Sequence, residues 1–293
     1  MTTLQAIDLS AKKAARQMLS DKFDAVRKHL LQVFETPTEA ERIHKLRVAV
    51  RRATAALDAF APCLPKREHK HARRVLRAIR RTAGVARDWD VFFPAVAEWV
   101  KGQPESVRPF VDALLGWSAS KRDSAQVGLT SLSDTFPAAL DKLCDDTLAA
   151  LHRPKGDPSA ADIGRERVEA LQAELTTACE HEPTADAEYH QIRIVGKRLR
   201  YAAEMFAEHV PDAEQIDADM RALQDVLGRF NDGVVGAKHL SEFAEHFQRF
   251  HPAEWGRLQP GADALGAHFA SVRDAERQRF HEWRTASQAS RAA

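Results

Sequence analysis

Residues 43–52 read Ile43-His-Lys-Leu-Arg-Val-Ala-Val-Arg-Arg, and apolar residues recur there with the period of an α-helix. On a helical wheel, the apolar positions from Leu46 to Phe60 fall on one side. His44, Arg47 and Arg51 fall together on the other side, at positions i, i+3 and i+7. The segment therefore predicts a helix with one face in a core and a basic stripe on the opposite face.

The same pattern returns 146 residues later, in Tyr189-His-Gln-Ile-Arg-Ile-Val-Gly-Lys-Arg. Apolar residues from Ile192 to Phe206 again fall on one side of the wheel. The basic stripe is longer here and spans about 15 Å at 1.5 Å per residue. It consists of His190, Arg193, Lys197 and Arg200.

A second pair of segments follows the first pair in the same order. Arg77-Ala-Ile-Arg, followed by Gly84, matches Arg221-Ala-Leu-Gln, followed by Gly228. Two ordered pairs indicate a duplicated helical bundle with about four helices in each copy. Turn-forming residues at 153–159 lie between the copies. We therefore predict an N-terminal half at residues 1–153 and a C-terminal half at residues 154–293.

The rest of the chain also has the composition of helices. Gly and Pro, 13 residues each, gather mainly at breaks between segments rich in Ala, Leu, Arg and Glu. No run alternates Val, Ile or Thr with polar residues between hairpin turns, so the predicted fold class is all-α. With 44% hydrophobic residues and no run of about 18 apolar residues, the chain has the pattern of a soluble protein. Three distant cysteines and the lack of a secretory pattern lead us to expect a cytoplasmic location.

The net charge of +1 hides a strong segregation of charge along the chain. Residues 42–90 contain 14 Lys or Arg and 4 Asp or Glu, whereas residues 201–246 contain 3 basic and 10 acidic residues. Local charge therefore decides which ligand each segment attracts, and a polyanion fits the first of the two segments.

A third basic stripe lies on the helical segment after the first repeat. Arg73, Arg77, Arg80 and Arg87 share one face with Gly84, where a missing side chain would let an anion approach the backbone. A basic helix face is usually just solvated, but solvated faces normally interleave acids at i, i+4. The first stripe has no acid within its span, and neighbouring cations repel by roughly 1 kcal/mol per pair. An anionic ligand would remove this cost, so we interpret the stripes as binding faces.

Residue type narrows the choice of anion. Arg offers a planar fork that matches phosphate oxygens, and Lys supplies a compact charge. Bases of nucleic acids would need aromatic platforms, but the chain has 2 Tyr and 5 Trp, and one aromatic neighbour of the stripes, Tyr201. Inorganic polyphosphate needs charge without aromatics and is therefore the predicted partner.

The two repeated histidines can be interpreted in two ways. A single histidine is more often a hydrogen-bonded structural residue, but His44 and His190 recur in the same register at the head of each stripe. In a phosphate-binding role, their protonation would make binding sensitive to pH. Neither has a ligand partner at i+3 or i+4 on its own helix, so no metal site is predicted.

These motifs resemble those of the CHAD family, the conserved histidine α-helical domain. The family pattern is His-x-x-Arg-x-x-x-(Lys/Arg)-Arg in each half, followed by a Leu-Gly-x-x-(Arg/Asn)-Asp helix break. Residues 44–52 and 190–198 match the first motif, and residues 84–88 and 227–232 match the second. The resemblance implies two four-helix bundles related by a pseudo-twofold axis, with a basic central cavity or groove that binds polyphosphate.

Carried over by position, the resemblance implies two basic walls with a third basic group between them. The implied polyphosphate-binding residues are His44, Arg47, Arg51, Arg52, Arg73, Arg77, Arg80, Arg81, His190, Arg193, Lys197, Arg198 and Arg200, with their neighbour Tyr201. Thr54 stands where family members often have an arginine. In the second half, Gln224 and Asp225 occupy the positions that correspond to Arg80 and Arg81. We therefore expect the site to be lopsided.

We expect a binding module rather than an enzyme. Phosphoryl transfer needs a metal ion held by carboxylates beside the cationic clamp. Asp88, Asp90 and Asp232 are the acids near the motifs, and they read as helix caps or ion-pair partners. No catalytic residue and no cofactor are therefore predicted. Family members are often fused to a triphosphate tunnel enzyme, and the strands and alternating Glu and Lys of that domain do not occur here.

Three alternatives to a pure polyphosphate binder stay open. One is an enzyme that acts on polyphosphate, and another is nucleic-acid binding. The third is a scaffold whose acidic segment, residues 204–245, recruits a basic partner while the basic groove holds the polymer. Some family members associate with polyphosphate granules, so granules are the expected place within the cytoplasm.

Overall fold

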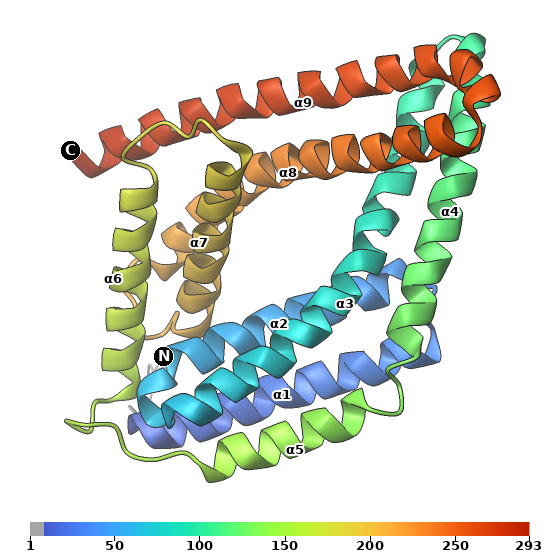
Figure 1. The fold of residues 1–293 in the computed structure, drawn as a ribbon. Helices are drawn as coiled ribbons and strands as arrows, with labels where there is room; N and C mark the ends of the chain where they lie inside the picture. The colour runs from blue at the N-terminus through green and yellow to red at the C-terminus, as the bar shows by residue number, and fades with distance from the viewer. Residues whose placement is uncertain (1–8, 293) are drawn as a thin grey trace, which may run out of the picture. The chain divides into compact units, whose positions relative to one another are not determined.

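The structure, a computed structural model, describes residues 9–292, with side chains to residue 288. Within residues 9–292 the chain forms nine α-helices, three short 3-10 helices and no strand, so the all-α prediction is confirmed (Figure 1). The α-helices are α1 (Ala11–Glu35), α2 (Ala40–Ala59), α3 (Lys66–Trp99), α4 (Arg108–Thr130), α5 (Phe136–Ala149), α6 (Ala160–Ala178), α7 (Asp186–Met205), α8 (Ala213–Phe250) and α9 (Pro252–Ala292). No helix in this part of the chain is long and apolar enough to cross a membrane.

The glycine motifs do not break their helices. α3 continues through Gly84 and Asp88, and α8 continues through Gly228 and Asp232. The helix breaks implied by the resemblance are therefore wrong, and so is the role of Asp88 as a helix cap. A glycine inside a helix costs only about 1 kcal/mol relative to alanine, and buried residues on both sides of each motif keep the helix packed.

The chain divides into two compact units. The described residues of unit 1 fall in Met1–Gly84, Gln126–Thr177 and Val195–Arg221, and those of unit 2 fall in Val85–Ala125, Ala178–Ile194 and Ala222–Ala293. Each unit takes segments from both sides of residue 153. The compact units are thus a different division from the two sequence halves, and the halves and their pseudo-twofold relation stay a prediction.

The core of unit 1 joins the two aromatic residues that end the repeated segments. Phe60 and Phe206 are both buried, with ring centroids 5.8 Å apart. Gly164 on α6 makes room for the second ring, because a Cβ there would lie 2.6 Å from the Cγ of Phe206. α1 lies along α2 and α5 in the same unit (Figure 1). This core holds the apolar faces of α2 and of the last turns of α7, so their basic faces point away from it.

The core of unit 2 is built from aromatic residues of four helices. Trp89 and Phe92 of α3 meet Phe110 of α4, Phe243 of α8 and Phe269 of α9 in one buried cluster. α8 and α9 lie side by side in this unit (Figure 1), and the Phe269 ring occupies the space above Gly236 that a Cβ would fill. Unit 2 therefore has its own hydrophobic core, as a compact domain requires.

A buried histidine lies in this aromatic core. His239 is 8% exposed and stacks on Trp89, with ring centroids 3.8 Å apart and an interplanar angle of 25°. Among the described residues neither ring nitrogen has a hydrogen-bond partner, and Nδ1 lies 3.6 Å from a carboxylate oxygen of Glu242. Burial lowers the pKa of His239, and repulsion from Lys238 adds to this, while Glu242 and Asp88 act in the opposite direction.

We expect His239 to make the protein less stable in acid. Its pKa is lower in the folded chain than the ordinary value of about 6.5 that applies when the chain is unfolded. The lowered pKa of His239 therefore contributes to the free energy of unfolding at pH values above the unfolded pKa. This contribution is lost as pH falls through the folded pKa. Chemical denaturation between pH 8 and pH 5 should show a smaller loss of unfolding free energy in His239→Leu than in the wild type. Equal losses in both proteins would contradict this assignment.

Candidate functional site

The basic stripe of α2 lies where the helical wheel placed it. Leu46, Ala53 and Leu57 are fully buried, whereas Arg47 and Arg51 are half-buried and His44 is exposed. The stripe does not end in solvent, because Asp58 continues it two turns beyond Arg51. The faces of this helix were therefore predictable, and the acid at the end of the stripe decides what packs there.

Asp58 ties α3 to α2. Its carboxylate is only 10% exposed, and Oδ1 lies 3.1 Å from Nε2 of His69 and 3.3 Å from Nε of Arg73. A buried carboxylate of this kind needs cationic or hydrogen-bonding partners, so the two α3 side chains are held against α2. The next turns of α3 carry Arg77 and Arg80, and Arg51 of α2 is near enough for its charge to act on Arg80.

Arg80 is the centre of a group of like charges. Partial burial lowers the pKa of Arg80, and repulsion from Arg51, Arg77 and Arg73 lowers it further. A guanidinium stays protonated at neutral pH all the same. Among the described residues no carboxylate lies within 4.0 Å of the side-chain nitrogens of Arg51, Arg77 or Arg80. Three guanidinium groups are thus held together without direct neutralisation.

Gly84 leaves room for Arg47. A Cβ at position 84 would lie 2.6 Å from Nη1 of Arg47, so the guanidinium of α2 occupies the space over the glycine of α3. The sequence had suggested that an anion would take this space, and the structure gives it to an arginine. The glycine therefore positions a cation one turn beyond Arg80.

Arg167 of α6 joins this group, although sequence reasoning did not select it. Burial lowers the pKa of Arg167, and Arg198 and Arg73 lower it further, while Asp58 and Glu174 oppose them. No carboxylate lies within 4.0 Å of its nitrogens in the described part of the chain. The sequence carries one signal for Arg167. Ile163 and Leu171, one turn before it and one turn after it, are both buried. A charged residue between two core positions indicates a specific role for the charge.

These side chains define the arginine cluster of unit 1. Its members come from α2, α3 and α6 and share half-buried or exposed guanidinium groups, with one buried acid, Asp58, at the edge. The members are Arg47, Arg51, Arg73, Arg77, Arg80 and Arg167. Such a cluster can bind a multivalent anion, since each guanidinium offers two parallel donors to a pair of phosphate oxygens.

Several other predicted residues are neutralised by acids from neighbouring helices. Arg198 donates to both carboxylate oxygens of Glu174, at 2.7 and 3.0 Å. Nε of Arg200 lies 3.2 Å from Asp217 Oδ1, and Nη2 of Arg52 lies 2.6 Å from Glu204 Oε1. A stripe without acids on its own helix can therefore still contain cations that acids of other helices neutralise.

The remaining predicted residues of unit 1 do not gather in one place. Tyr201 is buried and lines a small pocket of about 120 Å³ with Lys22 and Arg52. Arg81 is exposed on α3, and Lys197 is half-buried on α7 in unit 1. His44 lines a groove of about 340 Å³ between α1 and α2.

His190 and Arg193 belong to unit 2, at the start of α7. They line a pocket of about 260 Å³ with Phe230 of α8. Nδ1 of His190 lies 3.3 Å from Oδ1 of Asn231, so the repeated histidine contacts the second motif of its own half. The structural reading of this histidine is thereby supported for unit 2.

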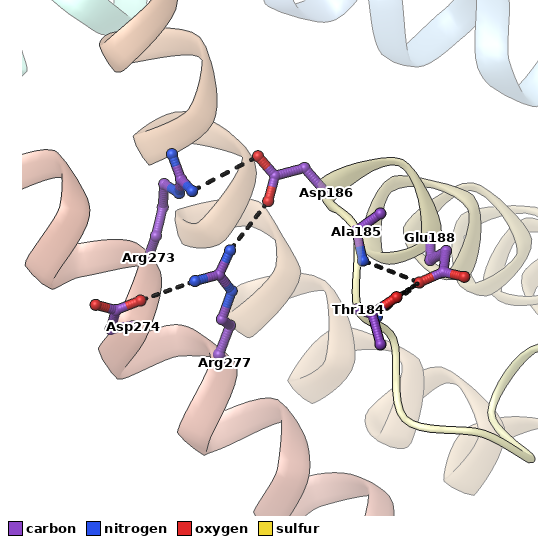
Figure 2. Close-up of polar contacts among 7 residues, drawn as sticks. All are labelled: Thr184, Ala185, Asp186, Glu188, Arg273, Asp274 and Arg277. Atoms are coloured by element: carbon purple, nitrogen blue, oxygen red, sulfur yellow. Dashed lines mark hydrogen bonds and ion pairs between the residues drawn. The ribbon is translucent and has the colours of Figure 1, made fainter.

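The start of α7 is anchored by carboxylates (Figure 2). Asp186 lies between two arginines of α9, 3.7 Å from Arg273 Nη2 and 3.2 Å from Arg277 Nη2. Glu188 accepts hydrogen bonds from the backbone N–H groups of Thr184 and Ala185, which lowers the pKa of its carboxyl. These contacts fix where the helix begins and therefore the rotation of its basic stripe.

Residues 9–241 match the family model of the CHAD domain. The chain belongs to the CHAD family. It is 26% identical over 215 residues to an uncharacterized protein, MT2285, of Mycobacterium tuberculosis (strain CDC 1551 / Oshkosh). That match covers 70% of this chain and 40% of the relative, so it spans about two fifths of the relative's length.

Two solved structures have the same fold. The CHAD domain of the plant Ricinus communis superposes with a TM-score of 0.72 at 24% identity, covering 95% of this chain and 93% of that one. PptA from Streptomyces chartreusis superposes with a TM-score of 0.74 at 19% identity, covering 94% and 99%. At these identities the similarity establishes the all-helical CHAD fold and leaves the ligand to be argued from this chain's own residues.

Metal-binding side chains do not gather in this CHAD domain as the arginines do. Among the described residues, no group of three or more His, Cys, Asp or Glu side chains is placed to hold a metal ion. Asp90, one of the acids near the motifs, forms an ion pair with Arg122, at 2.6 Å. The ion-pair role expected for this aspartate is confirmed.

Gly84→Ala tests the placement of Arg47. The new Cβ would displace the guanidinium, whereas the helix would gain up to about 1 kcal/mol in stability. We expect weaker binding of inorganic triphosphate by calorimetry, together with an unchanged or higher free energy of unfolding. Gly128→Ala on α4, where nothing lies within 4 Å, is the control and should leave binding unchanged. If the two variants bound triphosphate with equal affinity, Arg47 would not be part of the binding site.

Proposed function

We propose that this protein binds inorganic polyphosphate through the arginine cluster of unit 1 and catalyses no reaction. The observation that carries the proposal is the convergence of Arg51, Arg77 and Arg80 without a carboxylate within 4.0 Å in the described part of the chain. Repulsion among them costs roughly 1 kcal/mol per neighbouring pair. A folded protein retains such a cost where a ligand relieves it, and a chain of phosphates supplies negative charge at every unit.

The aromatic residues support a ligand without bases. Recognition of single-stranded nucleic acid relies on aromatic faces on which bases stack. Tyr201 is 7% exposed and so presents no open face, and Phe230, which lines the pocket of His190 and Arg193, is buried as well. The guanidinium groups offer forks that match phosphate oxygens and need no base. Polyphosphate therefore fits the cluster better than RNA or DNA.

Membership of the CHAD family supports the same ligand. The motifs that carry the resemblance include His44, Arg47 and Arg51 in the first half, and two of these three are members of the arginine cluster. Such domains resemble polyphosphate binders, and some associate with polyphosphate granules. We extend the proposal to the place where the polymer accumulates, on granules in the cytoplasm.

Substitution of the three central arginines should weaken ligand binding without lowering the free energy of unfolding. In Arg51→Gln/Arg77→Gln/Arg80→Gln, the affinity for long-chain polyphosphate should fall by at least tenfold. The slope of log Kd against log salt should fall by about 2 to 3, because three phosphate contacts no longer release counterions. The free energy of unfolding should stay the same or rise, since like charges that repel have been removed. Titration with labelled polymer at two salt concentrations and urea denaturation measure the two effects.

A matched control keeps the net charge of the triple variant. Lys13→Gln/Lys28→Gln/Lys155→Gln removes three exposed lysines from α1 and from the loop before α6. This control should bind with nearly wild-type affinity. If the arginine variant also binds like the control, the arginine cluster is a solvated face and the proposal is wrong.

Two further measurements test the alternatives. Wild-type protein incubated with polyphosphate and magnesium for hours should release no phosphate above background, and sustained turnover would show an enzyme instead. A single-stranded RNA with the same number of phosphates should compete poorly with labelled polyphosphate. Competition at equal concentration would favour general nucleic-acid binding.

A further inference from the structure

The side of α3 opposite its buried residues, which include Leu76 and Ile79, carries a second row of basic residues. His69, Arg73 and Arg80 take the side that faces α2, through their contacts with Asp58 and Arg51. Rotation by about 100° per residue then places the residues that follow them, Lys70, Arg74 and Arg81, further round the helix. We call this group the outer α3 row. It consists of Lys66, Lys70, Arg74 and Arg81, all of them exposed.

The outer α3 row is not neutralised by acids. No carboxylate lies within 4.0 Å of its side-chain nitrogens among the described residues. Glu68 is the one acid between Lys66 and Arg81, and it lies 4.0 Å from Nε of Arg67. Like charges at i, i+4 destabilise an exposed helix, whereas a solvated helix usually alternates its signs. This row therefore has the same unusual charge pattern as the adjacent arginine cluster.

Arg77 connects the two groups of cations. On the helical wheel it falls within the outer α3 row, between Lys66 and Lys70, and about 40° from Arg73 of the arginine cluster. It is exposed, and its charge lowers the pKa of Arg80, so it is electrostatically close to the centre of the cluster. A flexible polyanion can thus pass from one group to the other around α3 while staying next to a cation.

We propose that the outer α3 row is a second binding surface for the same polymer, occupied only by chains long enough to extend around α3 from the arginine cluster. This inference rests on the proposed function and adds a preference for chain length to it. The row spans about 22 Å from Lys66 to Arg81, at 1.5 Å per residue. Inorganic triphosphate is too short to occupy the cluster and this row together, whereas a long chain gains contacts at both.

The second surface works through effective concentration. Once one part of a long polymer is held at the cluster, the neighbouring phosphates are kept near the outer α3 row at a high local concentration. Each additional phosphate contact releases counterions and makes binding more sensitive to salt. Long polyphosphate should therefore bind more tightly, and with a steeper salt dependence, than triphosphate at equal phosphate concentration.

The test variant is Lys66→Gln/Lys70→Gln/Arg74→Gln, which leaves every member of the arginine cluster in place. Glutamine has nearly the same helix propensity as the residues it replaces, so the helix should form normally. The Kd for long-chain polyphosphate should rise at least tenfold, and the salt slope should fall by about 2 to 3. The Kd for inorganic triphosphate should stay within about twofold of the wild-type value.

The lysine control described above, on α1 and on the loop before α6, should change neither ligand's affinity. If the outer-row variant binds long polyphosphate like this control, the second surface does not exist. An equal loss for triphosphate and long polymer would also overturn the inference, because the row would then belong to a single site. Failure of the proposed function gives a different result, in which the wild type itself binds neither ligand.

Discussion

The guanidinium groups of Arg51, Arg77 and Arg80 are held near one another although their charges repel, and most features of unit 1 follow from this constraint. Repulsion alone would spread such side chains into solvent, where water and salt screen them. Something that does not depend on their charge must hold the two helices together. The buried apolar residues of each helix, such as Leu57 of α2 and Leu76 of α3, serve this purpose, because burial of such a side chain contributes about 1.5 to 3 kcal/mol through removal of apolar surface from water.

Asp58 complements the hydrophobic core by attraction. A carboxylate that is 10% exposed is costly unless it is paired, and its contacts with His69 and Arg73 link α2 to α3 at one end of the cluster. The acid neutralises one edge of the group and leaves the centre positive. Gly84 acts at the other end by leaving space for Arg47. The cluster is therefore bounded at one end by the negative charge of Asp58 and at the other end by Gly84, which has no side chain.

Acids of other helices reach several basic residues of α2 and α7. Glu174 and Asp217 lie within ion-pair distance of Arg198 and Arg200, and Glu204 lies on Arg52. Ion pairs between partly exposed side chains are worth little for stability, about 0 to 1 kcal/mol each. Their effect is chiefly electrostatic, since they lower the positive potential over part of unit 1. The acidic segment after residue 201 thus supplies two of the acids, Glu204 and Asp217, that lower this potential.

The amino-acid sequence determined the helical class, the breaks near Pro37, Pro104 and Pro211, and the two faces of α2 and α7, because helix propensity, proline and apolar period act over one or two turns. It also carried the CHAD motifs. Which cations stay uncompensated was decided only by tertiary structure, because a wheel shows one helix and the partners of Arg52 and Arg198 lie on others. Arg167 was missed for the same reason, since its neighbours Arg73 and Arg198 are distant in the chain. The continuity of α3 through Gly84 was a matter of packing as well, because buried neighbours on both sides outweigh the low helix propensity of one glycine.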